Sequence, residues 1–204
     1  MALDTYANLK AAIISFLDRD DLASYADDFI DLAEARHKRE ILIREMIARS
    51  QATLAGRFLS LPTRFNKMKT IRLLTNPVTV LTELSLHEMN LERDAATGRP
   101  SFFTVHEEIE FDVPPDNSPY TVEIIYYANF LPLDGTNTTN GLLVRAPDAY
   151  LYGALVASAP FLAADERIQT WETLYGVARD GLLLSDRQGR VGTSLGSRVS
   201  GAMP

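Results

Sequence analysis

The spacing of apolar residues changes character twice along this chain of 204 residues, and that change constrains the fold more than any other feature. Near both ends, apolar residues recur every three or four positions, as they do in amphipathic helices. Between about Ala52 and Phe130 they come instead in short, often β-branched runs, bounded by Pro62 and by Asn76-Pro77. The pattern predicts a helical body built from both ends of the chain, with a β-rich region inserted between them.

Four helical segments are predicted outside the β-rich region. They are expected over residues 3–17, over about Leu22 to Ala48, from Pro147 to Pro160, and from Ala164 or Asp165 onward. The acidic residues 18–21 supply a turn and a cap for the second helix, and Pro147 suits the first turn of the third. Trp171, on the last helix, is expected to be a core residue.

Inside the β-rich region the short runs predict strands and one helix. Strands are expected within residues 52–61, 68–74 and 78–81, a hairpin from residues 102–105 and 108–113, and a long strand from Tyr120 to Phe130. That last run is dominated by β-branched and aromatic residues, which favour strands. The helix is expected from Thr82, as its N-cap, to Arg93.

The predicted fold class is therefore α+β, with a helical bundle from the N- and C-terminal segments, an inserted and mostly antiparallel β region, and an extended C-terminal arm. The bundle is assigned to residues 1–50 and 142–184, the insertion with its one short helix to residues 51–141, and the flexible arm to residues 185–204. The arm sequence is small, polar and rich in glycine, so it lacks the apolar residues that a core requires.

Composition excludes several classes of protein. The net charge is −7, from 27 acidic and 20 basic residues, which argues against a surface that grips the outside of duplex DNA. Without cysteine, the chain has no disulfides, no thiolate zinc site and no Cys nucleophile. The N-terminus has no apolar signal region, and no apolar run approaches the ~18 residues of a membrane span. We expect a soluble product, made in a cytoplasm, without membrane contact.

One sequence motif suggests catalysis and does not fit its context. Residues 192–196 match G-x-S-x-G, with Ser194 at the nucleophile position, but that motif needs an acid and a His later in the chain, and the last His is His106. The three histidines (His37, His87 and His106) lack metal-ligand spacing, and the run from Asp134 lacks the final Glu of a calcium loop. We expect no catalytic residue, cofactor or metal.

The most specific segment runs from Thr139 to Tyr175. Its Pro-Asp entry, its Tyr-Leu-Tyr-Gly-Ala-Leu helix, its Ala-Pro-Phe-Leu break and its acidic turn resemble the C-terminal signature of the tailed-phage head-tail adaptor family, and weaker matches extend over most of residues 25–180. Gly141 departs from that pattern, because a bulky aromatic residue is expected there. The residues that carry the motif, and that are expected to form its core, are Pro147, Tyr150, Leu151, Tyr152, Gly153, Leu155, Pro160, Phe161, Trp171 and Tyr175.

The resemblance implies a structural adaptor of the phage neck. It implies a ring, dodecameric in the family, that lies beneath the portal, links capsid to tail and lets DNA pass without sequence-specific binding. The implied partners are the portal protein, a tail, nozzle or stopper protein below, and further copies of the chain, and the implied location is the virion neck. Two alternatives are another neck component, such as a stopper or tail-tube-proximal protein, and a non-viral enzyme or regulator. The long helical segments favour the adaptor, because those other neck proteins are mostly β.

Two sets of residues are candidates for assembly contacts. The arm is expected to dock onto the portal through Arg187, Arg190, Ser194, Leu195 and Arg198, unless it is a mobile end without a partner. Contacts between subunits, with the β region facing the tail, are expected at Arg36, Arg39, Arg44, Glu45, Phe102 and Tyr127. The charge-dense run that holds the first four of these also fits a plain solvated helix face with i,i+4 pairs.

Overall fold

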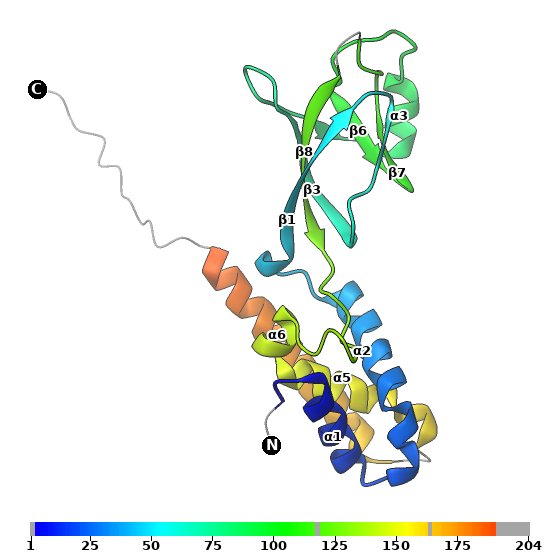
Figure 1. Ribbon diagram of the computed structural model, residues 1–204, viewed down its shortest axis with the longest axis vertical. Helices are drawn as coiled ribbons and strands as arrows, with labels where there is room; N and C mark the ends of the chain where they lie inside the picture. Colours follow the sequence, from blue (N-terminus) through cyan, green and yellow to red (C-terminus); the bar gives the residue numbers. More distant parts are fainter. Residues whose placement is uncertain (1–2, 117–118, 163–164, 191–204) are drawn as a thin grey trace, which may run out of the picture. The chain divides into compact units, whose positions relative to one another are not determined.

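The computed structural model describes residues 3–116, 119–162 and 165–190, and the chain divides into two compact units (Figure 1). The helical unit comprises Met1–Ile43 with Leu142–Pro204, and the β unit comprises Arg44–Gly141. The predicted α+β class, with a mostly antiparallel β region inserted between helical segments, is confirmed. The first division falls at Ile43 and not at residue 50, because the chain is already in a strand from Ile47 onward.

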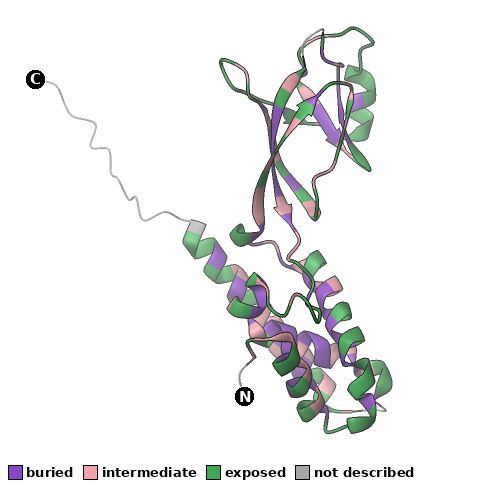
Figure 2. Cartoon of the chain, in the orientation of Figure 1, coloured by how far each residue is buried: buried purple, intermediate pink, exposed green. Residues whose placement is uncertain are grey.

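The helical unit is organised around α5 (Pro147–Ala157), which contacts α1 (Tyr6–Leu17), α2 (Ala26–Glu40) and α6 (Arg167–Arg190). The described part of the unit also contains the short helices η1 (Asp20–Tyr25), α4 (Gly141–Arg145) and η3 (Ala159–Phe161). Figure 2 shows α5 as largely buried, and a helix that is apolar on every side takes such a position in a bundle. Pro147 opens α5, as predicted.

The second helix is shorter than the sequence predicts, because it ends at Glu40 and not at Ala48. Ile41 adopts extended backbone angles, and both Ile41 and Ile43 are fully buried while Leu42 between them is not. This period of two is a strand pattern, and β-branched side chains favour it. The run of charges therefore spans a helix, an extended segment and the short helix η2 (Arg44–Met46).

The last helix is longer than predicted, because α6 continues through residues 185–190, which the sequence assigns to the arm. Leu182 and Asp186 are buried at a spacing of four, and the Arg145 guanidinium donates a 3.2 Å hydrogen bond to Ser185 Oγ, so this last part of α6 packs on the helical unit. Residues 191–204, which include Ser194, Leu195 and Arg198, lie outside the described residues.

The β unit contains two four-stranded sheets. Sheet A has the strand order β1-β8-β3-β4, formed by β1 (Ile47–Leu54), β8 (Tyr120–Ala128), β3 (Phe65–Leu73) and β4 (Thr79–Val80). Sheet B has the order β2-β7-β6-β5, formed by β2 (Phe58–Ser60), β7 (Glu108–Phe111), β6 (Phe102–Val105) and β5 (Thr82–Glu83). The pair β5–β6 is parallel and the other pairs are antiparallel. The predicted hairpin and the predicted long strand are both present.

The core of the β unit lies between the inner faces of the two sheets. Along β8, Val122, Ile124 and Tyr126 enter this core at every second position. Such alternation follows from the period of two in a strand and gives sheet A one inner and one outer face. The other buried members of the core are Leu54, Met68, Ile71, Leu73, Leu81, Phe103, Ile109, Phe111 and Ala128.

The predicted helix of the β region starts three residues later than expected. α3 spans Leu86–Glu92, with Ser85 as its N-cap, whereas Thr82 lies in β5. The Ser85 hydroxyl accepts a hydrogen bond from the Glu88 amide, and the Glu88 carboxylate accepts one from the Ser85 amide at 2.9 Å. This reciprocal capping box satisfies two amide groups that a helix start otherwise leaves unpaired.

The core of the β unit can be tested at Phe103, whose side chain is buried between the sheets. Phe103→Ala removes a fully buried ring and leaves a cavity, so we expect it to lower the free energy of unfolding of this unit by about 3–5 kcal/mol. Phe58→Ala, at a ring that is 46% exposed, should cost less than about 1 kcal/mol. Hydrogen exchange of the amides of β8 measures both, and equal effects would contradict this assignment of the core.

Candidate functional site

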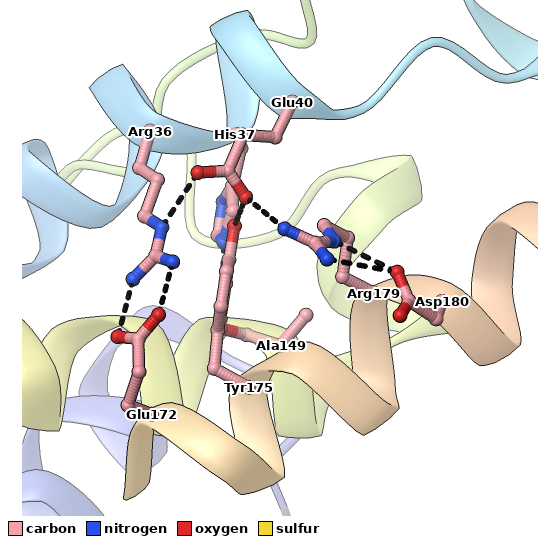
Figure 3. Close-up of polar contacts among 8 residues, drawn as sticks. All are labelled: Arg36, His37, Glu40, Ala149, Glu172, Tyr175, Arg179 and Asp180. Atoms are coloured by element: carbon pink, nitrogen blue, oxygen red, sulfur yellow. Dashed lines mark hydrogen bonds and ion pairs between the residues drawn. The ribbon is translucent and has the colours of Figure 1, made fainter. Parts of the chain in front are cut away.

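The second half of α2 meets α5 and α6 in a network of charged and aromatic side chains, here called the helix junction. It consists of Arg36, His37 and Glu40 from α2, with Glu172, Tyr175 and Arg179 from α6 (Figure 3). Two of these residues, Arg36 and Tyr175, are candidates from the sequence, as a subunit contact and as a family-motif residue. The junction joins segments that are more than 130 residues apart in the chain.

The Arg36 guanidinium donates hydrogen bonds to two carboxylates of the same chain, Glu172 and Glu40. Its two terminal nitrogens bind the two Glu172 oxygens at 2.8 and 2.5 Å, and its Nε donates to Glu40 at 2.8 Å. The guanidinium carbon also lies 4.0 Å from the centre of the Tyr175 ring, in a cation–π contact. Paired, forked hydrogen bonds of this kind fix geometry as well as charge. Arg36 therefore joins α2 to α6 in the structure.

Glu40 receives three donors at the other end of the network. The Tyr175 hydroxyl donates to it at 3.2 Å and Arg179 at 2.9 Å, in addition to Arg36. Burial acts to raise the pKa of Glu40, but the hydrogen bonds from Arg179 and Arg36 outweigh burial and hold that pKa below its usual value. The Arg36 hydrogen bond likewise lowers the pKa of Glu172. Burial, followed by the charge of Glu40, raises the pKa of Tyr175, so its hydroxyl keeps its proton.

His37, the aromatic member of the junction on α2, is neutral. Its ring is 4% exposed, meets the Tyr150 ring edge-on at 4.8 Å and stacks on Tyr175 at 5.9 Å. Burial lowers its pKa to about 4, and the neutral ring donates from Nε2 to the Ala149 carbonyl at 3.4 Å. The Tyr150 hydroxyl in turn donates to the buried Glu34 carboxylate at 3.1 Å. The histidine acts here as an aromatic packing residue between helices.

Gly153 permits the close approach of α5 to this layer of rings. A Cβ atom at this position would lie 3.2 Å from Ala33 Cβ, 3.3 Å from His37 Nε2 and 3.4 Å from Tyr175 Cε2. These distances are at the lower limit of normal packing, so a larger side chain would displace the rings. The close helix approach at Gly153 thus lies within the helical unit.

The other family-motif residues divide into a buried and an exposed group. Tyr150, Leu151, Leu155, Trp171 and Tyr175 are buried, and Tyr152 is half-buried. By contrast, Pro160 and Phe161 are exposed in η3, where the Phe161 ring lies 5.0 Å from that of Tyr25. The motif therefore records mainly how α5 and α6 pack, with the exposed Phe161 between these two helices in the sequence.

Gly141, which departs from the family pattern, has an aromatic ring at its side. A Cβ atom at Gly141 would lie 3.0 Å from Cε1 of Phe130, so Phe130 occupies the space that a side chain at 141 would enter. This close contact explains how the chain accommodates a glycine where the resemblance leads us to expect a bulky residue.

Beyond the junction, α6 presents an exposed and partly apolar surface, here called the α6 end. Val177 and Leu184 are 66% and 55% exposed on it, and Arg187 is exposed one turn further on. Two shallow hollows of about 340 and 410 Å³ flank these residues. The first is lined by Arg145, Ala146, Asp148, Val177, Ala178, Gly181, Leu182 and Ser185, and the second by Asp180, Leu183, Leu184 and Arg187. Arg190 is the last residue of α6.

The remaining interface candidates lie in both units. Arg39 is exposed on α2, in the helical unit. Arg44 and Glu45 are exposed on η2 of the β unit, 3.8 Å apart. Phe102 in β6 and Tyr127 in β8 are half-buried, and Lys69 Nζ lies 5.9 Å from the centre of the Tyr127 ring. The structure thus brings Arg36 into the junction but does not gather the other candidates into one site.

The described residues contain no group of three or more acidic or histidine side chains that could hold a metal ion. Asp134, at the start of the calcium-like run, instead caps its own turn, because its Oδ1 accepts from the amides of Thr136 and Asn137 at 2.6 Å. The G-x-S-x-G run falls outside the described residues. In the described part of the chain, no helix is long and apolar enough to cross a membrane.

Sequence reasoning missed most of the partners in the junction. Glu40 is visible from sequence only through its i,i+4 spacing from Arg36. Glu172 and Arg179 flank Tyr175 on α6 at distances of three and four residues, but their partners lie across the fold on α2. From the sequence, one could have expected the charged residues of α6 to pair with the charged run on α2. The individual pairs could not have been predicted.

The comparison with protein families agrees with this architecture. The family model described as SU10 adaptor protein matches residues 4–198, which is nearly the whole chain. The chain belongs to this family of phage head-tail adaptors, and the resemblance predicted from the sequence is confirmed. It is therefore a structural component of a phage virion that interacts with other head and tail proteins. A comparison with curated proteins gives no match.

The close packing at Gly153 can be tested by adding a side chain. Gly153→Leu should push a branched side chain into the rings of His37 and Tyr175 and destabilise the helical unit by about 1–3 kcal/mol or more. Gly176→Leu is the matched control, because no atom lies within 4 Å of its Cβ position, and the better helix propensity of leucine should make it neutral or stabilising. Urea unfolding followed by the fluorescence of Trp171, the single tryptophan, reports on this unit alone.

The pKa of His37 predicts a pH-dependent stability. Because the pKa falls from its usual 6.5 to about 4 in the folded chain, the unfolded chain binds more protons between these values. Stability is therefore retained above pH 6.5 and is lost as the pH falls, by about 2 kcal/mol between pH 7 and pH 5. Glu40 and Glu172, whose pKa values are lowered in the folded chain, affect the stability mainly below pH 5.

The same urea titrations at pH 7 and pH 5 test this dependence. His37→Phe should remove most of the difference between the two pH values, although it alters the packing. His87→Gln, at an exposed ring, should keep it. An unchanged pH dependence in His37→Phe would show that His37 does not cause the loss.

Proposed function

We propose that this chain is the subunit of a ring that binds beneath the portal, connects the capsid to the tail and lets DNA pass. Membership of the adaptor family over residues 4–198 is the observation that carries this proposal. This role is supported by the helix junction, whose polar network fastens helices to each other, and by the charged and apolar side chains that stay exposed for partners.

The α6 end is the proposed portal-binding surface, together with the residues that follow it. Val177 and Leu184 offer apolar area, and Arg187 offers a cation that can pair with acidic or carbonyl groups. Arg190 and Arg198 continue this basic character toward the C-terminus, where the sequence holds no further acidic residue after Asp186. A segment that becomes ordered on binding can wrap around a partner, at an entropic cost.

The β unit is the proposed tail-facing part and also contributes contacts between copies. Phe102 and Tyr127 are half-buried aromatic residues at its surface, and such residues commonly anchor protein interfaces. The net charge of −7 suits passage of DNA, because like charge gives phosphates no tight binding site. The ring is proposed from the adaptor family, with the dodecameric order that the resemblance implies.

Removal of residues 191–204 tests the portal contact, and it leaves α6 complete. We expect a chain that ends at Arg190 to keep its fold, as shown by Trp171 fluorescence, and to bind the assembled portal at least about tenfold more weakly, a loss of ~1.4 kcal/mol. Sedimentation of the portal with bound chain measures this affinity.

Two matched variants separate charge from chain length in this experiment. Arg198→Glu reverses one charge in the removed segment, and Arg187→Glu does the same on α6. Both should weaken portal binding, and the effect should shrink as salt rises. A truncated chain that binds the portal with unchanged affinity would exclude the C-terminal segment as the docking element.

A further inference from the structure

The outer face of sheet A carries a cluster of positive charge. Opposite to the core-facing residues of β8, Glu123, Ile125 and Tyr127 point to the other side of the sheet. The strand register places Arg49, Lys67 and Arg72 beside them, because residues paired across antiparallel strands share a face. Lys69 lies at an irregularity of β3, and its Nζ is 5.9 Å from the centre of the Tyr127 ring. This outer face is defined here by Arg49, Lys67, Lys69, Arg72, Glu123, Ile125 and Tyr127.

The charges on the outer face do not balance. Its one carboxylate, Glu123, is 8% exposed and pairs with Arg72 and, at 3.6 Å, with Arg49. Lys67 and Lys69 are exposed, and in the described part of the chain neither forms an ion pair. Four cations against one acid leave this face strongly basic in a protein whose net charge is −7. Lys67 and Lys69 are therefore available to an acidic partner, while Arg49 and Arg72 already pair with Glu123.

The start of α2 offers a surface of the opposite sign. Between residues 18 and 31 the chain has six Asp residues and one Arg. Asp28 and Asp31 are exposed on α2 beside the exposed apolar side chains Tyr25 and Leu32, and Phe161 packs on Tyr25 at 5.0 Å. This group of five residues, here called the α2 patch, combines negative charge with apolar area. The outer face complements this patch, because its cations match the negative charge and its half-buried Tyr127 ring offers apolar area.

We propose that the outer face of sheet A of one copy binds the α2 patch of the next copy. This inference rests on the proposed ring, and it names the two surfaces that form its subunit contact. Because the two surfaces differ, the contact is head-to-tail, and a head-to-tail contact closes into a ring when its rotation allows. Opposite charge steers the encounter, and the exposed apolar residues supply area that becomes buried.

Nucleic acid fits the outer face less well than a second copy does. The Glu123 carboxylate lies within the cluster and already holds Arg49 and Arg72, so only two lysines remain for phosphates. Affinity for duplex DNA comes mainly from the number of phosphates that are neutralised. As a partner of the outer face, the α2 patch also offers exposed apolar side chains, which a phosphate backbone does not have.

Charge reversal tests the contact. The face variant is Lys67→Glu with Lys69→Glu, and the patch variant is Asp28→Lys with Asp31→Lys. Each alone should form rings on the portal at least about tenfold less readily than the unaltered chain, because like charges then meet at every contact. An equimolar mixture should restore rings, since copies that alternate in order bring opposite charges together at both kinds of contact. Native mass spectrometry of the complex with the portal counts both variants in each ring.

Matched controls separate the contact from general effects of charge. Glu92→Lys with Glu107→Lys changes the net charge as the patch variant does, at exposed positions outside both surfaces, and should leave assembly unchanged. Trp171 fluorescence and circular dichroism verify folding of every variant. Rescue in the mixture cannot come from misfolded chains, so it supports the proposed contact directly.

Three results would overturn this inference, and they differ in whether the proposed ring is also excluded. If the variants assemble as the unaltered chain does, or the mixture fails to recover, the subunit contact lies elsewhere while the ring stands. If the face variant assembles normally but loses affinity for duplex DNA, the outer face binds nucleic acid. If the unaltered chain forms no ring on the portal, the proposed function fails and this contact fails with it.

Discussion

The forked pair between Arg36 and Glu172 is the interaction on which the helical unit depends. It joins residues 136 positions apart, and the Tyr175 ring beneath the guanidinium and the Glu40 carboxylate beside it fix its geometry. Such a pair, once partly buried, is costly to break from one side, because the remaining charge loses its partner. The two ends of the chain are held together here, so the intervening residues can form a separate β unit.

Local pattern predicts those elements of the fold that are long and uniform. β8 and the β6–β7 hairpin follow from β-branched and alternating residues, and α5 follows from Pro147 and the apolar stripe after it. The end of α2 escapes prediction because only Ile41 and Ile43 signal a strand-like period, within a run of charges that favours a helix. Residues 185–190 escape for the opposite reason, since small polar residues suggest a coil until the burial of Asp186 is known.

The candidate site shows where sequence reasoning ends. The resemblance selects Tyr150, Gly153 and Tyr175, and the structure explains these through the packing of α2, α5 and α6 around His37. The sequence does not reveal the ionic partner of Arg36. Several acidic residues could pair with Arg36, and only the tertiary fold selects Glu172. Arg36 shows how a charge that suggests an interface can serve the interior of one chain.

The split of the helical unit between both ends of the chain also sets an order of synthesis. The β unit is complete when residue 141 leaves the ribosome, and domains generally fold as units during translation. α1 and α2 by then have been made, but the α5 and α6 surfaces that bury Phe29, Ile30 and His37 have not. The first two helices of each nascent chain must therefore wait, with apolar side chains uncovered, until Tyr175 has been added.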